Sequence, residues 1–233
     1  MIRRFSDRRE AGDVLAKKLG DFANRSDVII LALPRGGVPV GYEVATTLKA
    51  PLEVFVVRKL GVPWHEELAM GALASGGVRF LDESLIKAAG VTESEIERVT
   101  AREERELERR ELLYRGDRPF PSLEGKTAIL VDDGLATGST MRAAVSALRL
   151  EKPARIVVAV PVAARETCEA FRNIADEIVC AMTPDPFNAV PRCWASAPRW
   201  SRPHARHPRP AAAPGAPGCA RRPSVRPGPA THA

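Results

Sequence analysis

The sequence predicts an α/β protein: a doubly wound parallel sheet of about five strands with flanking helices, plus a small hood or insertion region. Three observations predict this class. Short apolar runs rich in β-branched residues, typical of strands buried on both faces, recur along the chain. Helical patterns separate most of them, which indicates parallel pairing through right-handed crossovers. Small-residue turns follow two of the runs, and ligands of such sheets bind where strands end.

The individual elements follow from this alternation. Strands are expected at 28–33, 52–57, 127–131, 155–160 and 176–181. Helices are expected at about 7–20, 39–48, 141–150 and 164–174. The first of these helices begins at a capping box formed by Asp7 and Glu10.

The pattern changes between the second and third expected strands, where the hood would lie. Residues 69–74 and 78–81 predict a hairpin around a Ser-Gly-Gly turn. A further capping box opens a charged helix from about 93 to 114. Because its acids match its bases, we expect a solvated helix with i,i+4 ion pairs, and binding of nucleic acid is the weaker alternative.

Composition divides the chain at residue 190. The net charge is +6, but residues 191–233 carry eight arginines, no lysine and no acid, which leaves −2 for residues 1–190. That tail also holds ten of the twenty prolines and has no hydrophobic period, so it cannot bury enough apolar surface to fold. We therefore expect one domain at 1–190. We interpret 191–233 as the product of a reading-frame shift, with a basic nucleic-acid-binding arm as the rival.

Cysteine usage and hydropathy favour a cytoplasmic protein. The four cysteines have neither metal-ligand spacing nor a CxxC pair, so reduced, inert thiols are expected; they are Cys168, Cys180, Cys193 and Cys219. No apolar run approaches the roughly 18 residues of a membrane span. The basic amino terminus is not followed by an apolar region, so no signal peptide is expected.

One stretch, residues 129–140, carries most of the functional information. The apolar strand ends in Asp132-Asp133, a Gly/Ser/Thr turn follows, and a helix begins. Small residues let backbone N–H groups converge on an anion, and the helix start adds partial positive charge. The two acids suit a polyol or a divalent cation. A sugar phosphate with a metal ion satisfies both halves of the pattern.

A second glycine turn follows the first strand, in Pro34-Arg35-Gly36-Gly37. The glycines permit backbone conformations that other residues do not, and Arg35 can bind phosphate through two parallel hydrogen bonds. The alternative is an ordinary turn with a solvated arginine. Arg58 and Lys59 end the second strand, where two cations would neutralise a diphosphate.

Residues 129–140 resemble the phosphoribosyl diphosphate signature of the type I phosphoribosyltransferases: apolar residues, two acids, two spacers, then a small-Thr-Gly-small-Thr loop. The pattern is not a Walker loop, because no lysine follows the glycine. The resemblance covers roughly residues 3–190. It looks closest to the predicted phosphoribosyltransferases that begin with a Phe-x-Asp-Arg-Arg-Glu-Ala-Gly helix, as in residues 5–12.

The resemblance implies transfer of ribose 5-phosphate from phosphoribosyl diphosphate to a nitrogen acceptor, usually a nucleobase, with release of pyrophosphate. Asp132 and Asp133 would hold the ribose hydroxyls, directly or through Mg²⁺. The diphosphate would meet Arg35, the backbone of Gly36 and Gly37, and the catalytic cations Arg58 and Lys59. The loop expected to hold the 5-phosphate comprises Ala136, Thr137, Gly138, Ser139 and Thr140.

Four residues bear on the acceptor, but they do not identify it. Purine-salvage members tend to carry an acid where this chain has Ala136, which argues against a hypoxanthine or guanine enzyme. The segment around Phe187 resembles the family's late base-binding loop, so Phe187 would stack on the base or else belong to the core. His65 is expected to be an exposed loop histidine, and Trp64 either stacks on a base or holds its loop in place.

Two other functions remain open from the sequence. A regulator that senses phosphoribosyl diphosphate or nucleotides would carry the same loops without turnover. A hydrolase of phosphorylated sugars uses a similar anion loop. The expected partners are phosphoribosyl diphosphate and a small-molecule acceptor, without a membrane or nucleic acid, and a homodimer is an open possibility.

Overall fold

The computed structural model describes residues 5–185 and residue 187. The expected tail at 191–233 lies outside the described residues. In the described part of the chain, no helix is both long enough and apolar enough to cross a membrane.

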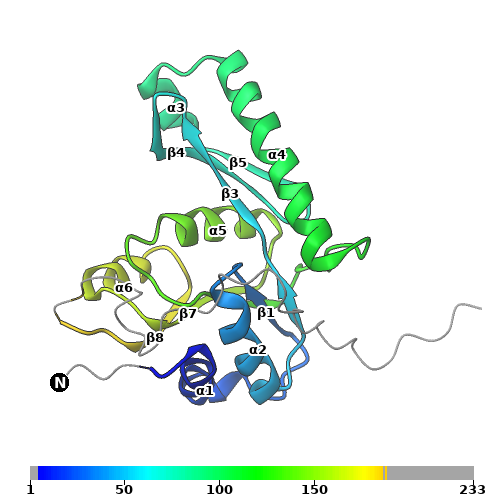
Figure 1. Cartoon of the computed structure of the whole chain (residues 1–233), viewed down its shortest axis with the longest axis vertical. Helices are drawn as coiled ribbons and strands as arrows, with labels where there is room; N and C mark the ends of the chain where they lie inside the picture. The colour runs from blue at the N-terminus through cyan, green and yellow to red at the C-terminus, as the bar shows by residue number, and fades with distance from the viewer. Residues whose placement is uncertain (1–4, 186, 188–233) are drawn as a thin grey trace, which may run out of the picture.

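A five-stranded parallel sheet forms the centre of the domain, in the order β2-β1-β6-β7-β8 (Figure 1). Its strands are β1 (Val28–Ala32), β2 (Leu52–Val54), β6 (Thr127–Val131), β7 (Arg155–Val162) and β8 (Glu177–Met182). The central strands β1 and β6 are fully buried because they consist of continuous apolar runs. The expected doubly wound parallel sheet is confirmed.

Helices cover both faces of this sheet. On one face lie α1 (Arg8–Lys18) and α2 (Gly37–Leu48), whose Leu15, Val40 and Val44 pack on β1, β6 and β7. On the other face lie α5 (Ser139–Leu150) and α6 (Arg165–Phe171). A 3-10 turn at Gly20–Phe22 follows α1. The two apolar faces of the sheet are thus closed by separate helix pairs.

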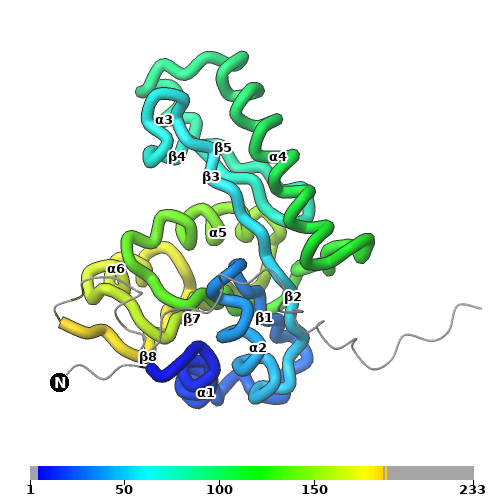
Figure 2. Tube along the Cα trace, in the orientation of Figure 1, coloured from blue at the N-terminus to red at the C-terminus, as the bar shows by residue number. Residues whose placement is uncertain are grey.

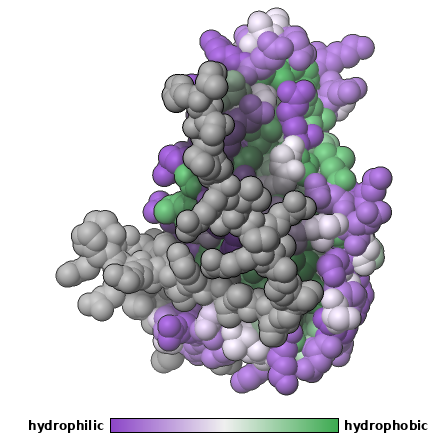
Figure 3. All heavy atoms as spheres, turned by 90° about the vertical axis from the view of Figure 1, so that its right-hand side faces the viewer, coloured by the Kyte–Doolittle hydropathy of each residue, from purple (hydrophilic) through white to green (hydrophobic). Residues whose placement is uncertain are grey.

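The hood is a second unit, above α5 in Figure 1. It contains an antiparallel sheet of β3 (Val57–Val62), β4 (His65–Ala74) and β5 (Val78–Leu81), with α3 (Glu83–Ala89) and α4 (Glu93–Arg115). Ile96, Val99 and Leu107 of α4 pack on the hood sheet. Figure 3, which turns the α4 side toward the viewer, shows hydrophilic side chains around apolar surface in this upper part.

Three sequence-based boundaries were wrong. The expected strand 52–57 is divided, because the chain leaves the main sheet after Val54 and enters the hood sheet at Val57 (Figure 2). Arg58 and Lys59, which were expected to end a strand, lie inside β3, which runs to Val62, and a tight turn leads to β4 at His65. Helix α3 was not predicted.

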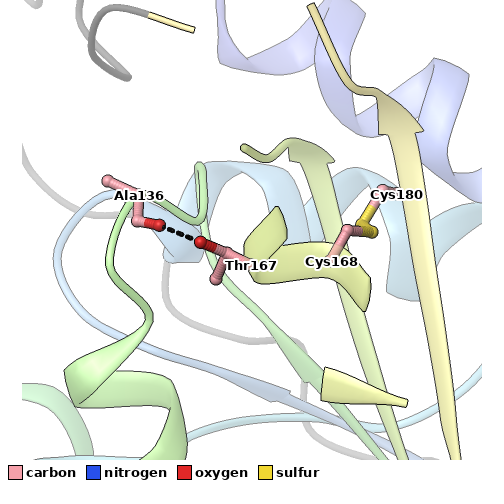
Figure 4. The surroundings of a disulfide bond; sticks show 4 residues. All are labelled: Ala136, Thr167, Cys168 and Cys180. Carbon is pink, nitrogen blue, oxygen red and sulfur yellow. Dashed lines mark hydrogen bonds between the residues drawn. A yellow bond between two sulfur atoms is a disulfide. The ribbon is translucent and has the colours of Figure 1, made fainter. Parts of the chain in front are cut away.

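The expectation of free thiols is also wrong for two cysteines. Cys168 of α6 and Cys180 of β8 form a disulfide. They are 12 residues apart in sequence, so no CxxC motif announces them, but the turn between α6 and β8 brings them face to face (Figure 4). Cys193 and Cys219 lie outside the described residues.

Candidate functional site

The two glycine-containing loops meet at the carboxyl ends of β1 and β6. These neighbouring strands pair in register to their last residues, Ala32 with Val131, so the loops that follow start side by side. The Leu33 N–H donates a 2.8 Å hydrogen bond to the Val131 carbonyl, which extends the pairing into the loops. The sheet therefore brings Gly36 and Gly37 against Val131, Asp132 and Asp133 at the carboxyl ends of the two strands.

Gly36 and Gly37 are required for this close approach. A Cβ atom on Gly36 would lie 2.3 Å from the carboxyl carbon of Asp133, and one on Gly37 would lie 2.5 Å from the Val131 carbonyl oxygen. No real Cβ atom lies this close to a neighbouring atom. The two glycines therefore let the two loops touch, in addition to forming a turn. The peptide bond between Pro34 and Arg35 is cis, and Arg35 is exposed.

The two carboxylates of the acid pair have different surroundings. Asp132 Oδ1 accepts a 2.8 Å hydrogen bond from the Asp133 N–H. Asp133 Oδ2 accepts from the guanidinium of Arg8 on α1, with Nε at 3.0 Å, and both side chains are mostly buried. Burial raises the pKa of the Asp132 carboxyl to about 8, with the Asp133 charge acting in the same direction and the Arg8 charge opposing the shift. Burial thus disfavours the charged form of Asp132, whereas Arg8 pairs with the carboxylate of Asp133.

The loop between Ala136 and Thr140 ends at the amino terminus of α5. Gly138 has φ +74° and its carbonyl accepts from the Arg142 N–H at 2.8 Å. No side-chain hydrogen bond caps this helix, so its first N–H groups can bind an anion, and the helix dipole favours one. The geometry fits a phosphate group.

Helix α6 supports the loop from behind. Thr167 Oγ1 donates a 2.6 Å hydrogen bond to the Ala136 carbonyl (Figure 4). A Cβ atom on Gly138 would lie 2.6 Å from Cε2 of Phe171 and 3.1 Å from Cγ2 of Thr167. The neighbouring Cys168 ties the same helix to β8. The loop therefore rests on a helix that is itself covalently attached to the sheet.

Arg58 and Lys59, the two cations expected to bind the diphosphate, have different partners on either side of β3. Lys59 Nζ lies 3.4 Å from Ser139 Oγ at the start of α5 and 3.8 Å from Glu67 Oε2. Arg58 instead donates from Nε to Glu103 of α4 at 2.7 Å. Successive residues of a strand face opposite sides, so only one of two neighbours can reach the loop. The structure brings Lys59 to the site and turns Arg58 into the hood.

Two of the remaining expected residues lie at the β3–β4 turn of the hood, and the third follows β8. Trp64 is 60% exposed at the β3–β4 turn. His65 is exposed, as expected, and its Nδ1 accepts from the Leu68 N–H at 3.2 Å. Phe187 is half-buried beyond β8, between residues outside the described part, and its base-stacking role stays a prediction.

Sequence reasoning missed Arg8 and Thr167. Arg8 is 125 residues from Asp133, and Thr167 is 31 residues from Ala136. Arg8 lies in the Phe-x-Asp-Arg-Arg stretch, which was recognisable as a pattern. The pattern does not indicate that Arg8 pairs with Asp133. Nothing in the local sequence of Thr167 distinguishes it from a solvated helix residue.

The acid pair and the two glycine-containing loops lie at the carboxyl ends of adjacent parallel strands, where α/β proteins of this class bind their ligands. Residues 8–195 match the model of the phosphoribosyl transferase domain. The chain belongs to this family, and its parallel sheet with a hood is the expected fold.

Two kinds of relatives support the assignment. Proteins from two strains of Mycobacterium tuberculosis, CDC 1551 and H37Rv, provisionally named phosphoribosyl transferases, are 42% identical over 186 residues. That match covers 80% of this chain and 42% of each relative, so the chain spans less than half their length. The crystal structure of TT1426 from Thermus thermophilus has 41% identity and a TM-score of 0.75, covering 82% of this chain and 90% of that one.

Proposed function

We propose that this domain transfers ribose 5-phosphate from phosphoribosyl diphosphate to a nitrogen acceptor of the nucleobase type and releases pyrophosphate. The observation that carries the proposal is the contact between Gly36 and Asp133. This contact supports the proposal because it brings the acid pair, which suits ribose hydroxyls, next to the 34–37 loop. The 34–37 and 136–140 loops would each hold one phosphorylated end of the substrate. The likeness of the chain to the family supports the same reaction.

Each part of the site has a proposed task. The backbone of 136–140 and the hydroxyls of Thr137, Ser139 and Thr140 hold the 5-phosphate. Asp132 and Asp133 orient the ribose through its hydroxyls. Arg35, the 36–37 backbone and Lys59 hold the diphosphate that departs. Arg58 acts through its ion pair with Glu103, which fixes the strand that carries Lys59.

These residues favour the reaction through position and charge. The ribose carbon becomes electron-poor as its bond to the diphosphate breaks, so fixed groups around it matter more than proton transfer. Two loops that grip the phosphates at opposite ends would hold the breaking bond in one place. The exposed methyl group of Ala136 provides no acid to the acceptor, so the acceptor need not be a purine.

The acid pair fits Mg²⁺ only together with the substrate. Among the described residues, no group of three or more His, Cys, Asp or Glu side chains could hold a metal ion. Mg²⁺ commonly takes one or two carboxylates and completes its shell with substrate oxygens and water. Asp132 and Asp133 would contribute those carboxylates. The bound ion would neutralise the charge of the leaving pyrophosphate.

Calorimetric titration with phosphoribosyl diphosphate, with and without Mg²⁺, tests the proposal. We expect Mg²⁺-dependent binding that is lost in the Asp132→Asn/Asp133→Asn variant, with an unchanged fold by circular dichroism. Asp117→Asn, an exposed carboxylate change outside the site, is the matched control. Unchanged affinity in the double variant would exclude these acids from the site.

A screen of nucleobases for pyrophosphate release then tests turnover. Release with one base identifies the acceptor and confirms the transferase. Tight binding without release for any base would favour a sensor of phosphoribosyl diphosphate, which is the alternative function. Release of ribose phosphate without any acceptor would favour a hydrolase.

A further inference from the structure

A half-open hollow lies in the hood, between the β3–β4 hairpin and α4. Its volume is about 420 Å³, within the range of roughly 300–1,000 Å³ typical of small-molecule sites. The lining residues are Gly61, Pro63 and Glu66 from the hairpin and Arg98, Val99, Arg102 and Arg105 from α4. The proposed transferase site uses none of them.

The hairpin is shaped at Gly61. The β3–β4 register shifts on both sides of this residue, as in a bulge. A Cβ atom on Gly61 would lie 2.6 Å from the Glu66 carbonyl oxygen and 2.8 Å from its Cα. Only glycine lets the two chains approach so closely, and the irregularity re-aims the end of the hairpin that borders the hollow.

Three arginines project from one face of α4. Arg98, Arg102 and Arg105 are spaced i, i+4 and i+7, which places them on the same side of a helix. Among the described residues that line the hollow, Glu66 is the only carboxylate. The lining therefore carries a formal excess of two positive charges.

The pairing of the α4 arginines separates this face from the rest of the helix. Four of the six arginines have carboxylate partners; they are Arg102, Arg109, Arg110 and Arg115. Arg98 and Arg105 form no ion pair within 4.0 Å of any carboxylate of the described residues. The charge of Arg98 still helps to lower the pKa of Glu95, after the hydrogen bonds from Thr92, and Arg105 Nε donates to the Ala101 carbonyl at 3.1 Å. Both of these arginines line the hollow. The two α4 arginines without a close carboxylate partner thus both border this one hollow.

We propose that this hollow is an anion site for a small polyphosphate, such as the di- or triphosphate group of a nucleotide. The guanidinium group presents planar donors that match phosphate oxygens in pairs. Arginines on successive helical turns can each contact one phosphate of a chain of phosphates. A ligand with a single carboxylate group could contact only one of these arginines. Arg102, which Glu66 contacts from 3.6 Å, would exchange that exposed carboxylate for the ligand.

Titration with inorganic triphosphate in the presence of EDTA tests the site on the full chain. We compare Arg98→Gln/Arg105→Gln with Arg109→Gln/Arg110→Gln, which removes the same charge from the same helix but from arginines paired with Glu106. The first variant should bind about tenfold more weakly or lose one class of sites, since charge-assisted hydrogen bonds to phosphate are removed. The second should bind like the wild type. Equal affinity in all three proteins, or equal loss in both variants, would overturn the proposal.

Arginine modification by a dicarbonyl reagent locates the bound anion. Peptide mapping should show that triphosphate protects Arg98 and Arg105 and leaves Arg109 reactive. The Asp132→Asn/Asp133→Asn variant should keep this protection, so a failed transferase proposal would not imitate a failed hood site. Protection confined to Arg35, with Arg98 and Arg105 fully reactive, would contradict the hood site.

Discussion

The replacement Gly138→Ala tests whether the phosphate loop rests on α6 as described. Alanine at φ +74° is strained by about 1–2 kcal/mol, the cost of the left-handed region for a residue with a Cβ atom. Its Cβ atom would also lie 2.6 Å from Phe171 Cε2, and overpacking of this kind costs about 1–3 kcal/mol. The free energy of unfolding should therefore fall by about 2–5 kcal/mol.

Gly125 provides a matched control within the chain. It has φ +70°, but a Cβ atom there would meet no atom within 4 Å. Gly125→Ala should thus cost only the backbone strain, about 1–2 kcal/mol. The difference between the two variants isolates the clash with α6.

Urea unfolding measures this difference, and calorimetry measures the accompanying loss of phosphoribosyl diphosphate affinity. Gly138→Ala should lose affinity because the loop must move away from Phe171, while Gly125→Ala should bind like the wild type. If the two variants unfold at the same urea concentration and bind equally well, the loop does not rest on α6 and the reasoning fails.

Three further results are expected. Arg115→Met should lower the free energy of unfolding by about 3–5 kcal/mol in urea titrations, because it leaves the buried carboxylate of Glu53 unpaired, whereas Arg109→Met at the exposed surface should change it little. Replacing Cys168 and Cys180 by serine should lower the free energy of unfolding by about 3 kcal/mol under non-reducing conditions, because the disulfide no longer closes a loop between residues 12 apart in the unfolded chain. Treating the wild type with a dithiol should lower it by the same amount. The raised pKa of Asp132 means that the folded protein holds a proton that the unfolded chain releases, so stability should fall as pH rises from 3.8 to about 8, and this slope should disappear in Asp132→Asn.

The central sheet and the two glycine-containing loops at its edge were predictable because their signals are local. A buried parallel strand must be a continuous apolar run, and a loop that binds phosphate must follow it with small residues. The resemblance at 129–140 added the order of the acids and the threonines. The contact between Gly36 and Asp133 then follows from adjacent strands in register.

The direction of Arg58 could have been foreseen. Two neighbouring residues of a strand face opposite sides, so assigning both Arg58 and Lys59 to one diphosphate required a loop there. The sequence was interpreted as a strand ending in a polar loop, whereas β3 continues through both residues. Once that strand is extended, only one of the two cations can face α5.

Contacts between segments far apart in the chain could not be predicted from the sequence. Arg8 reaches Asp133 because α1 packs beside α2 on the same face of the central sheet. Cys168 meets Cys180 because the chain turns back after α6 and runs along β8. Each depends on the orientation of a helix on the sheet. Periodicity identifies which face of a helix is buried, but it does not determine the helix's rotation or its neighbours.

The hood is attached to the core through the segment that divides β2 from β3. Phe55 and Val56 are fully buried, the Phe55 N–H donates to the Ala32 carbonyl at 3.0 Å, and the Val56 N–H donates to Ser75 Oγ at 3.0 Å. The chain thus bonds to the core sheet at one residue and to the hood at the next. Lys59 lies three residues further along, so its distance from Ser139 is set by this short, buried connection. Rotation of the hood about the connection would move Lys59 relative to the phosphate loop, which makes the hood a structural part of the proposed diphosphate site.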